Sequence, residues 1–581
     1  MIPEVRTHNH PVIPAVLPES VVTRLGEILF LLIFPIAWFL SLHLSAVNQA
    51  GYLDPYFYTG YIHNMADLFA RYGMPYYSVR FGLILPARLL GLAFGFDAGY
   101  LIFRYLLALI AGIPVYLFAR GLFGRVVGLA IYSALLTTPF FTRSLFWDHP
   151  DAAAVPYLLG AIGLFLLGRH PVRDVAAGIL FGLALHCNFF TVSVSGLFFA
   201  AFSLATILLR RPLGPLVIRI GCVLAGVMLA TFAGVIYYWR LIGVLNILSP
   251  TLEVSRWLSR GGMLDYRLPG VSWIRSNLHV LVLPIIAIYT LFASCFRRVR
   301  LEVLTLTLYV VATSLYFYIY QLFFRADILQ LHYYYVYSLP AIFFSVIVVI
   351  DQLWDGLKDS HSVLLSVILF TSFLGPWVIG VYVWNWFPAV HLTQLVELAI
   401  VAGAAVAAAI LIRGDGGWRR GVASIATFSL GLFLAAGFSG PIFAGVFERQ
   451  GSQERNIYRV AEQFISAVPK QRDHPGRVCF WYSNRSGDMI NSVQATYLWG
   501  FSRCSSPIAG AGMPVIGEFE SKQFEDPKLK YIVLLGDSAD ELTSALAALK
   551  ASNIAFVPVQ NRILSSGDYR VYFEYVELVR R

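Results

Sequence analysis

The chain has 581 residues, of which 58% are hydrophobic and only 13% are charged, and its mean hydropathy is +0.68. Soluble domains carry roughly twice this share of charged residues, so the composition excludes a soluble enzyme, and the amount of apolar sequence excludes a single-pass receptor. The net charge of +10 does not indicate a nucleic-acid partner, because the Lys and Arg residues stand at the ends of apolar runs and not in one patch.

Apolar runs fill the chain up to about residue 443. At about 20 residues per span, they predict an α-helical polytopic membrane protein with about thirteen transmembrane helices. The first run is interpreted as an uncleaved helix, because it is longer than the apolar part of a signal peptide and no clear cleavage site follows it. The expected spans are 28–47, 100–119, 125–141, 152–168, 174–188, 190–209, 217–239, 279–295, 301–322, 333–350, 362–383, 392–412 and 421–443.

Arginines between alternate spans predict the topology. The positive-inside rule places these short loops in the cytoplasm. The N-terminus is therefore expected in the cytoplasm, and the loops at about 48–99, 142–151 and 240–278 are expected on the extracytoplasmic side. The compact loops and the lack of a retention signal favour a bacterial inner membrane. The loop arginines are Arg120, Arg125, Arg169, Arg173, Arg210, Arg211, Arg219, Arg297, Arg298, Arg300, Arg413, Arg419 and Arg420.

The composition changes after the last span, which divides the chain into a membrane domain, 1–445, and a small extracytoplasmic α/β domain, 446–581. A disulfide between Cys479 and Cys504 fits an oxidising compartment. Alternation and periodicity predict helices at 457–468, 490–499 and 540–550, and strands at 478–482, 531–535 and 569–579.

The first outer loop places Asp54 just beyond the first span, among aromatic residues that include Tyr56. A partly desolvated carboxylate at such an interface has a raised pKa and suits a general base that takes a proton from an acceptor hydroxyl or amine. An Asp-Pro turn at a helix end is the alternative interpretation, and the dipeptide alone favours it. Tyr56 is a candidate substrate-binding residue.

The second outer loop carries Asp148, His149 and Asp151. The two carboxylates are three residues apart and fit one helix face, so they are candidates for binding a substrate or a divalent cation. The same residues also make a good start for the following helix, and capping is certainly part of their role. No cofactor is required on this interpretation, and a divalent metal is possible.

Basic residues on the outer face suit a substrate that carries a phosphate, because Arg binds phosphate through two parallel hydrogen bonds. Arg80 and Arg325 are the candidates for this contact, and His332 is a further candidate for substrate binding. The tyrosines after His332 suit an interfacial belt as well as a sugar platform.

Taken together, these features resemble the GT-C superfamily of membrane glycosyltransferases, and in particular the branch that contains protein O-mannosyltransferases and the lipid A aminoarabinose transferase. The resemblance covers about residues 27–170 and then continues as topology alone. It rests on the order of Asp54, the segment 76–82, the segment 102–105, the segment 116–125 and the acidic loop 148–151.

The resemblance implies an inverting transfer of a hexosyl or pentosyl group from a polyprenyl-phosphate donor to a lipid, glycan or protein acceptor, with Asp54 as the catalytic base. The chain departs from this branch at two positions. Leu53 replaces the first member of an acidic pair, and Arg80 is followed by Phe81 and Gly82 where relatives have a proline-rich segment. The Trp-Trp-Asp signature of oligosaccharyltransferases is absent, so sequon-directed N-glycosylation is not indicated.

Two other classes remain open on the sequence. A multi-span transporter or lipid flippase also has many spans, although such proteins commonly show internal repeats, and the sequence shows no clear repeat of halves. A scaffold with a C-terminal binding domain is the third class. Product formation separates the enzyme from both.

Overall fold

The computed structural model describes residues 21–41, 45–48, 53–137, 139–259, 300–323, 332–356, 451–468, 477–482, 529–551 and 553–579, together with residues 283, 284, 287, 290 and 329. The expected spans 362–383, 392–412 and 421–443 lie outside the described residues, as do most of the expected span 279–295 and the expected helix 490–499.

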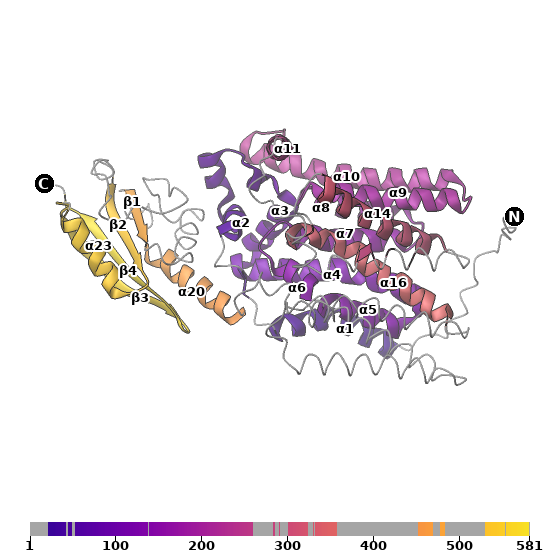
Figure 1. Cartoon of the computed structure of the whole chain (residues 1–581), viewed down its shortest axis with the longest axis horizontal. Coiled ribbons are helices and arrows are strands. Elements are labelled where there is room, and N and C mark those ends of the chain that lie inside the picture. Colours follow the sequence, from indigo (N-terminus) through magenta and orange to yellow (C-terminus); the bar gives the residue numbers. More distant parts are fainter. Residues whose placement is uncertain are drawn as a thin grey trace.

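A body of packed helices forms the larger part of the molecule (Figure 1). It includes two short 3₁₀ turns, Tyr76–Val79 and Val336–Ser338. The α-helices are α1 (Val21–Ser41), α2 (Leu53–Tyr72), α3 (Phe81–Phe94), α4 (Phe96–Phe123), α5 (Arg125–Thr137), α6 (Pro139–Phe146), α7 (Asp151–Leu166), α8 (Pro171–Leu185), α9 (Phe190–Leu208), α10 (Leu213–Ile242), α11 (Ser249–Ser259), α14 (Leu301–Phe323), α15 (His332–Tyr335) and α16 (Leu339–Gly356).

Among the described residues, four helices are long and apolar enough to cross a bilayer, namely α4, α9, α10 and most of α14. They contain the expected spans 100–119, 217–239 and 301–322, and all but the last residue of 190–209. Helix α10 also leaves large apolar side chains exposed, such as Val217, Met228 and Phe232, as lipid contact requires. These helices indicate an integral membrane protein.

Two expected spans are divided in the structure. In place of one helix at 125–141, α5 ends at Thr137 and α6 begins at Pro139. Proline lacks an N–H group and fits the first position of a helix, which accounts for this division. The expected span 333–350 likewise contains α15, a 3₁₀ turn and the start of α16.

Glycines bring α8 and α10 into close contact. A Cβ atom at Gly178 would lie 2.1 Å from the carbonyl oxygen of Val223, and one at Gly226 would lie 2.1 Å from that of Val175. Small residues allow helix backbones to approach closely inside a membrane. A buried ion pair adds to this contact, since Arg219 Nε of α10 lies 3.0 Å from Asp174 Oδ2 of α8.

The C-terminal part is a four-stranded sheet in the order β1-β2-β4-β3 with one described helix on each face. Strand β1 is parallel to β2, and the other pairs are antiparallel. Side chains of α20 pack against one face and side chains of α23 against the other. The elements are α20 (Gly451–Ala467), β1 (Arg477–Tyr482), β2 (Leu529–Gly536), α23 (Ala539–Ala551), β3 (Phe556–Ser566) and β4 (Tyr569–Leu578).

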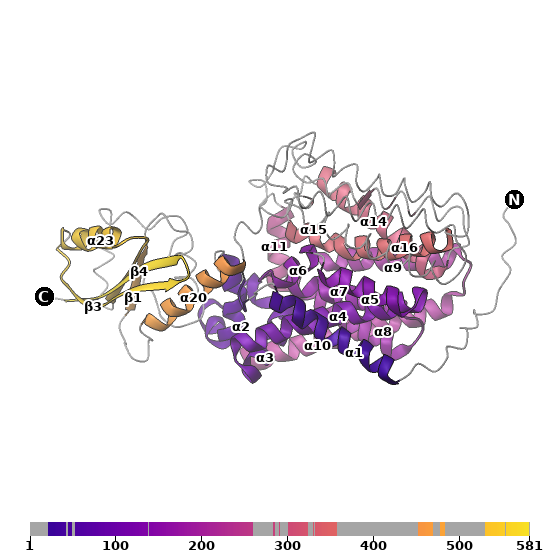
Figure 2. The same ribbon diagram turned by 90° about the horizontal axis from the view of Figure 1, so that it is seen from below.

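Helix α20 joins the two parts of the molecule (Figure 2). Its residues Ile457, Tyr458 and Ile465 pack into the core of the helical body, whereas Val460 and Phe464 pack against the sheet. The Tyr458 hydroxyl donates to Asp97 Oδ1 at 2.6 Å, at the first turn of α4. The helix therefore fixes the sheet beside the end of the body where α2 and α3 meet α4.

Strand β3 is absent from the sequence-based expectations, while the other described elements of this part lie where the sequence predicts them. Pro558 stands inside β3, beside an irregularity in its pairing with β4, and proline is tolerated on an edge strand or at a bulge. Cys479 lies in β1, whereas Cys504 lies outside the described residues, so their disulfide stays a prediction.

We expect Gly178→Ala to lower the midpoint of thermal unfolding of the purified chain in detergent, because its methyl group overlaps the backbone of α10. The cost is about 1–3 kcal/mol. Gly196→Ala on α9 is the matched control, since a Cβ atom there meets nothing within 4 Å. Equal unfolding midpoints for the two variants would contradict the close approach of α8 and α10.

Candidate active site

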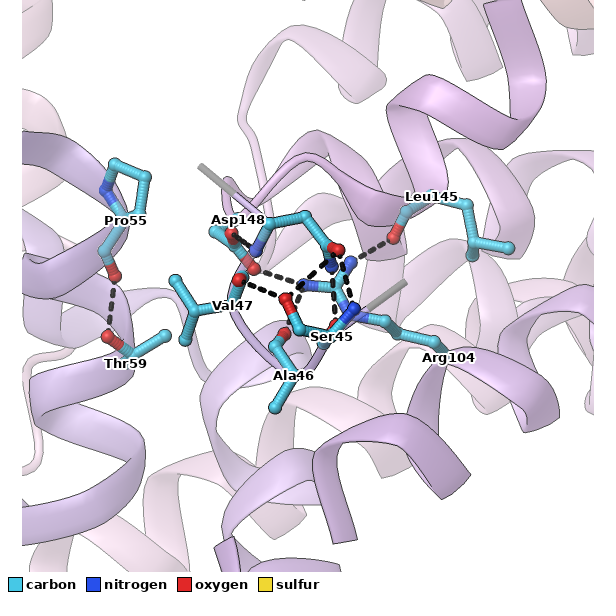
Figure 3. A network of polar contacts seen from close by, with 9 residues as sticks. Ser45, Ala46, Val47, Pro55, Thr59, Arg104, Leu145 and Asp148 are labelled. Carbon is cyan, nitrogen blue, oxygen red and sulfur yellow. Dashed lines mark hydrogen bonds and ion pairs between the residues drawn. The ribbon is translucent and has the colours of Figure 1, made fainter. Parts of the chain in front are cut away.

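A buried ion pair between Arg104 of α4 and Asp148 of the loop before α7 organises one part of the helical body (Figure 3). Both side chains are almost fully buried. The Arg104 guanidinium also donates to the carbonyl oxygen of Leu145, and it lies 4.4 Å from the centre of the Tyr100 ring. The second oxygen of Asp148 accepts a hydrogen bond of 2.8 Å from the backbone N–H of Asn48.

The contact with Asn48 connects the segment after α1 to the loop before α7. Asn48 and Ser45 bond to each other through side chain and backbone, at 2.9 Å and 2.6 Å, and so form a compact turn. Asp148 holds this turn from one side and Arg104 holds Asp148 from the other. The chain then enters α2, where Asp54 stands in the first turn.

Asp54, in the first turn of α2, and His149, in the loop before α7, face each other. Asp54 Oδ2 lies 3.7 Å from His149 Nε2, and the Asp54 side chain is 48% exposed. The half that is covered loses enough water to raise the pKa of the Asp54 carboxyl above its usual value. The His149 ring is flanked by the rings of Trp147, at 5.2 Å, and of Tyr58, at 5.5 Å.

Arg80 is a buried cation whose side chain forms no ion pair with any residue that the structure describes. It stands between the 3₁₀ turn 76–79 and α3 and is 3% exposed. Its Nε atom lacks a hydrogen-bond acceptor, and its guanidinium lies 3.9 Å from the centre of the Tyr76 ring. A cation–π contact replaces only part of the lost hydration of a buried charge.

Aromatic rings connect Arg80 to the pair of Asp54 and His149. The Tyr77 ring lies 5.8 Å from that of Tyr76 and 5.4 Å from that of Tyr58. Burial raises the pKa of Tyr58 well above its usual value, the charge of Arg80 opposes this shift, and the charges of Asp54 and Asp151 add to it. All three charged groups therefore lie within electrostatic reach of one buried tyrosine.

Asp151 begins α7 and is almost fully buried. Its Oδ1 atom accepts hydrogen bonds from the Tyr337 hydroxyl and from Asn188 Nδ2, the latter at 3.2 Å. Asp151 thus joins the second outer loop to the end of α8 and to the turn before α16, although these elements lie far apart in the sequence.

The two carboxylates of the second outer loop have separate partners, Arg104 for Asp148 and Tyr337 with Asn188 for Asp151. No group of three or more His, Cys, Asp and Glu residues in the described part of the chain is arranged to hold a metal ion. The residues present therefore do not fit the optional divalent cation.

Three sequence-based candidates remain, namely Arg325, His332 and Tyr56. Arg325 lies outside the described residues, and His332 is the first residue of α15. Tyr56 is fully buried in the core of the body. The tyrosine that faces His149 is Tyr58, which is four residues from Asp54 and therefore on the same side of α2. This spacing is the signal in the sequence that could have found Tyr58.

No protein-family model and no curated protein sequence matches the chain. Among solved structures, it is similar to ArnT from Cupriavidus metallidurans bound to undecaprenyl phosphate, with 14% identity, a TM-score of 0.47 and coverage of 95% of this chain and 98% of that chain. An oligosaccharyltransferase from Archaeoglobus fulgidus, tethered with an acceptor peptide, has 15% identity and a TM-score of 0.40 over 88% of this chain and 69% of that chain.

The structural neighbours are GT-C superfamily proteins. Apo ArnT from Cupriavidus metallidurans gives much the same values as the bound form, with 15% identity and a TM-score of 0.46 over 96% of this chain and 98% of that chain. At these TM-scores the GT-C neighbours assign no role to a residue, so the roles proposed below rest on the contacts of this chain.

We expect Asp148→Asn to destabilise the purified chain strongly, because it leaves the buried charge of Arg104 without a counter-ion. Breaking a buried pair in this way costs about 3–5 kcal/mol. Glu577→Gln is the control, since it removes the ion pair between Lys530 and Glu577, whose side chains are 49% and 42% exposed. Thermal unfolding in detergent measures both, and an unchanged midpoint for Asp148→Asn would contradict the role given to the pair.

Proposed function

We propose that the chain is a membrane glycosyltransferase that moves a sugar from a polyprenyl-phosphate donor to an acceptor on the extracytoplasmic side. The observation that carries this proposal is the buried guanidinium of Arg80, which forms no ion pair with a described residue and which aromatic rings connect to the pair of Asp54 and His149. The sequence resemblance to the GT-C superfamily supports it.

Arg80 suits the phosphate of the donor for a physical reason. A buried cation without a counter-ion is unstable relative to one that is paired, so a bound anion stabilises the site as well as itself. The planar guanidinium matches two oxygens of a phosphate. When the bond between the sugar and the phosphate breaks, the phosphate gains negative charge, and a fixed cation beside it lowers the energy of that transition state.

Asp54 suits the role of general base. Its raised pKa makes the carboxylate a better proton acceptor, and its exposed half leaves room for an acceptor hydroxyl or amine. In the proposed step, Asp54 takes the proton from the acceptor while the acceptor oxygen or nitrogen attacks the anomeric carbon. The phosphate leaves from the opposite face with the bonding electron pair, so the configuration at the anomeric carbon inverts.

His149 is proposed as a substrate-binding residue beside the base. Its Nε2 atom faces Asp54, and the aromatic rings on both sides of it, together with Tyr77, form an apolar wall. Such rings suit the apolar face of a hexosyl or pentosyl group. Asp148 and Asp151 then hold the loop in place, through Arg104 and through Tyr337 with Asn188.

A lipid flippase remains the alternative, because it would use a buried Arg for the same lipid phosphate. Asp54 separates the two functions, since a flippase has no need for a general base at the phosphate site. The product is therefore the decisive observation.

We expect Asp54→Asn to lower the rate of sugar transfer by about 10²–10⁴-fold, the usual contribution of a general base. The assay measures label transferred from polyprenyl-phosphate sugars to acceptors in a native membrane extract. Wild-type activity should also fall as the pH drops through the pKa of Asp54, because only the ionised carboxylate accepts the proton. Asp67→Asn, on the same helix, is the control. Full activity in Asp54→Asn would refute the assignment of the base.

We expect Arg80→Gln to weaken the binding of polyprenyl phosphate by about tenfold or more, because one charge-assisted contact is lost. Arg80→Lys should retain part of the affinity, since it keeps the charge but not the planar geometry. Arg240→Gln, at an exposed position in the last turn of α10, serves as the matched control. Binding that is the same in Arg80→Gln and in wild type would place the phosphate elsewhere.

A further inference from the structure

A polar groove lies between α20 and β3 in the sheet domain. It has a volume of about 580 Å³ and is formed by one side of the helix and by the middle of the edge strand. It is distinct from the site around Asp54. The lining residues are Arg459, Glu462, Gln463, Ser466, Arg562, Ile563 and Leu564.

The walls of the groove are fixed to each other by hydrogen bonds at one end. Gln463 Nε2 donates to the carbonyl oxygen of Ser565 at 3.0 Å, and the N–H of Ser565 donates to Gln463 Oε1 at 3.1 Å. The Ser566 hydroxyl bonds Asn456 Oδ1 at 2.9 Å. The Gln463 side chain of α20 thus bonds both the N–H and the carbonyl oxygen of Ser565 on the edge strand β3. These bonds hold the two walls of the groove together.

Two cations line the groove, Arg459 from the helix and Arg562 from the strand. Neither forms an ion pair with any residue of the described ranges. The charge of Arg459 acts on Glu462, and Arg562 contacts the side-chain oxygen of Gln560. Both side chains are exposed, and two guanidinium groups that line one concave surface suit a phosphate or sulfate group, which accepts several hydrogen bonds.

Glu462 is the acidic residue of the groove, and its charge depends on its neighbours. Burial, followed by the nearby carboxylate of Asp97 at the start of α4, raises the pKa of Glu462 to about 7, while Tyr458 and Arg459 oppose the shift. Below this pH, Glu462 is mostly protonated and the arginines determine the charge of the groove. Above it, the carboxylate adds a negative charge beside Arg459, across the groove from Arg562.

We propose that the groove between α20 and β3 is a binding site for an anionic phosphate or sulfate group, held by Arg459 and Arg562. The anionic group belongs either to a lipid headgroup or to a soluble molecule such as a phosphorylated or sulfated glycan. Because α20 also contacts the body through Tyr458 and Asp97, an anion bound here lies beside the joint between the two parts of the chain.

Sulfate is the probe for a soluble anion, because its charge stays constant across neutral pH. The full chain is placed in phosphatidylcholine nanodiscs, and hydrogen exchange of peptides from α20 and β3 is followed as sulfate is added. We expect protection in the wild type and about tenfold weaker binding in the double variant Arg459→Gln with Arg562→Gln. Arg570→Gln, an exposed position on β4 outside the groove, should bind like the wild type.

A second comparison uses nanodiscs that contain phosphatidylglycerol and no sulfate. Protection of the same peptides there, lost in the double variant, identifies a lipid headgroup as a ligand, whereas protection by sulfate alone identifies a soluble anion. Either result supports the proposal. Protection by neither anion, or protection that is the same in the double variant, would overturn it.

Glu462→Gln tests the pH dependence of sulfate binding. This dependence would not change if the arginines had only a structural role. Sulfate binding to the wild type should weaken by about fivefold between about pH 6 and about pH 8, as the Glu462 carboxylate forms and repels the anion. In Glu462→Gln this dependence should disappear. A dependence of the same size in both proteins would show that Glu462 does not face the bound anion.

Discussion

The buried ion pair of Arg104 and Asp148 is the contact on which the arrangement of the candidate site depends. Asp148 receives one hydrogen bond from the turn after α1 and pairs with α4, so three segments distant in the sequence meet at one carboxylate. Without this contact, the loop that carries His149 and the turn that leads to Asp54 would have no fixed relation. The cost of burying two charges is offset by further bonds to the carbonyl oxygens of Leu145 and Ala46.

Arg80 is also a buried arginine, but it differs from Arg104 in its partners. It is nearly as buried as Arg104, yet no described carboxylate pairs with it, and its guanidinium lies over the Tyr76 ring. Arg104 has a carboxylate partner, whereas Arg80 has none among the described residues, and this difference favours an anionic ligand at Arg80. In the sheet domain, Arg459 and Arg562 likewise form no ion pair with a described residue, although their groove is open to solvent.

The sequence predicted the helical body and the small sheet domain, because apolar runs and turn residues report burial directly. It did not predict the partners of the charged residues. Asp148 and Asp151 look alike in sequence, but Asp148 pairs with Arg104, 44 residues away, whereas Asp151 bonds Tyr337, 186 residues away. Strand β3 was missed because Pro558 signals a break, which an edge strand tolerates through a bulge.

A structure of the full chain in nanodiscs with polyprenyl phosphate would test the proposed function most directly. We predict that the phosphate lies against the guanidinium of Arg80, with the Asp54 carboxylate open toward the space beside it. A phosphate bound at another part of the chain, with Arg80 still enclosed by Tyr76 and in contact with no anion, would contradict the assignment of this site.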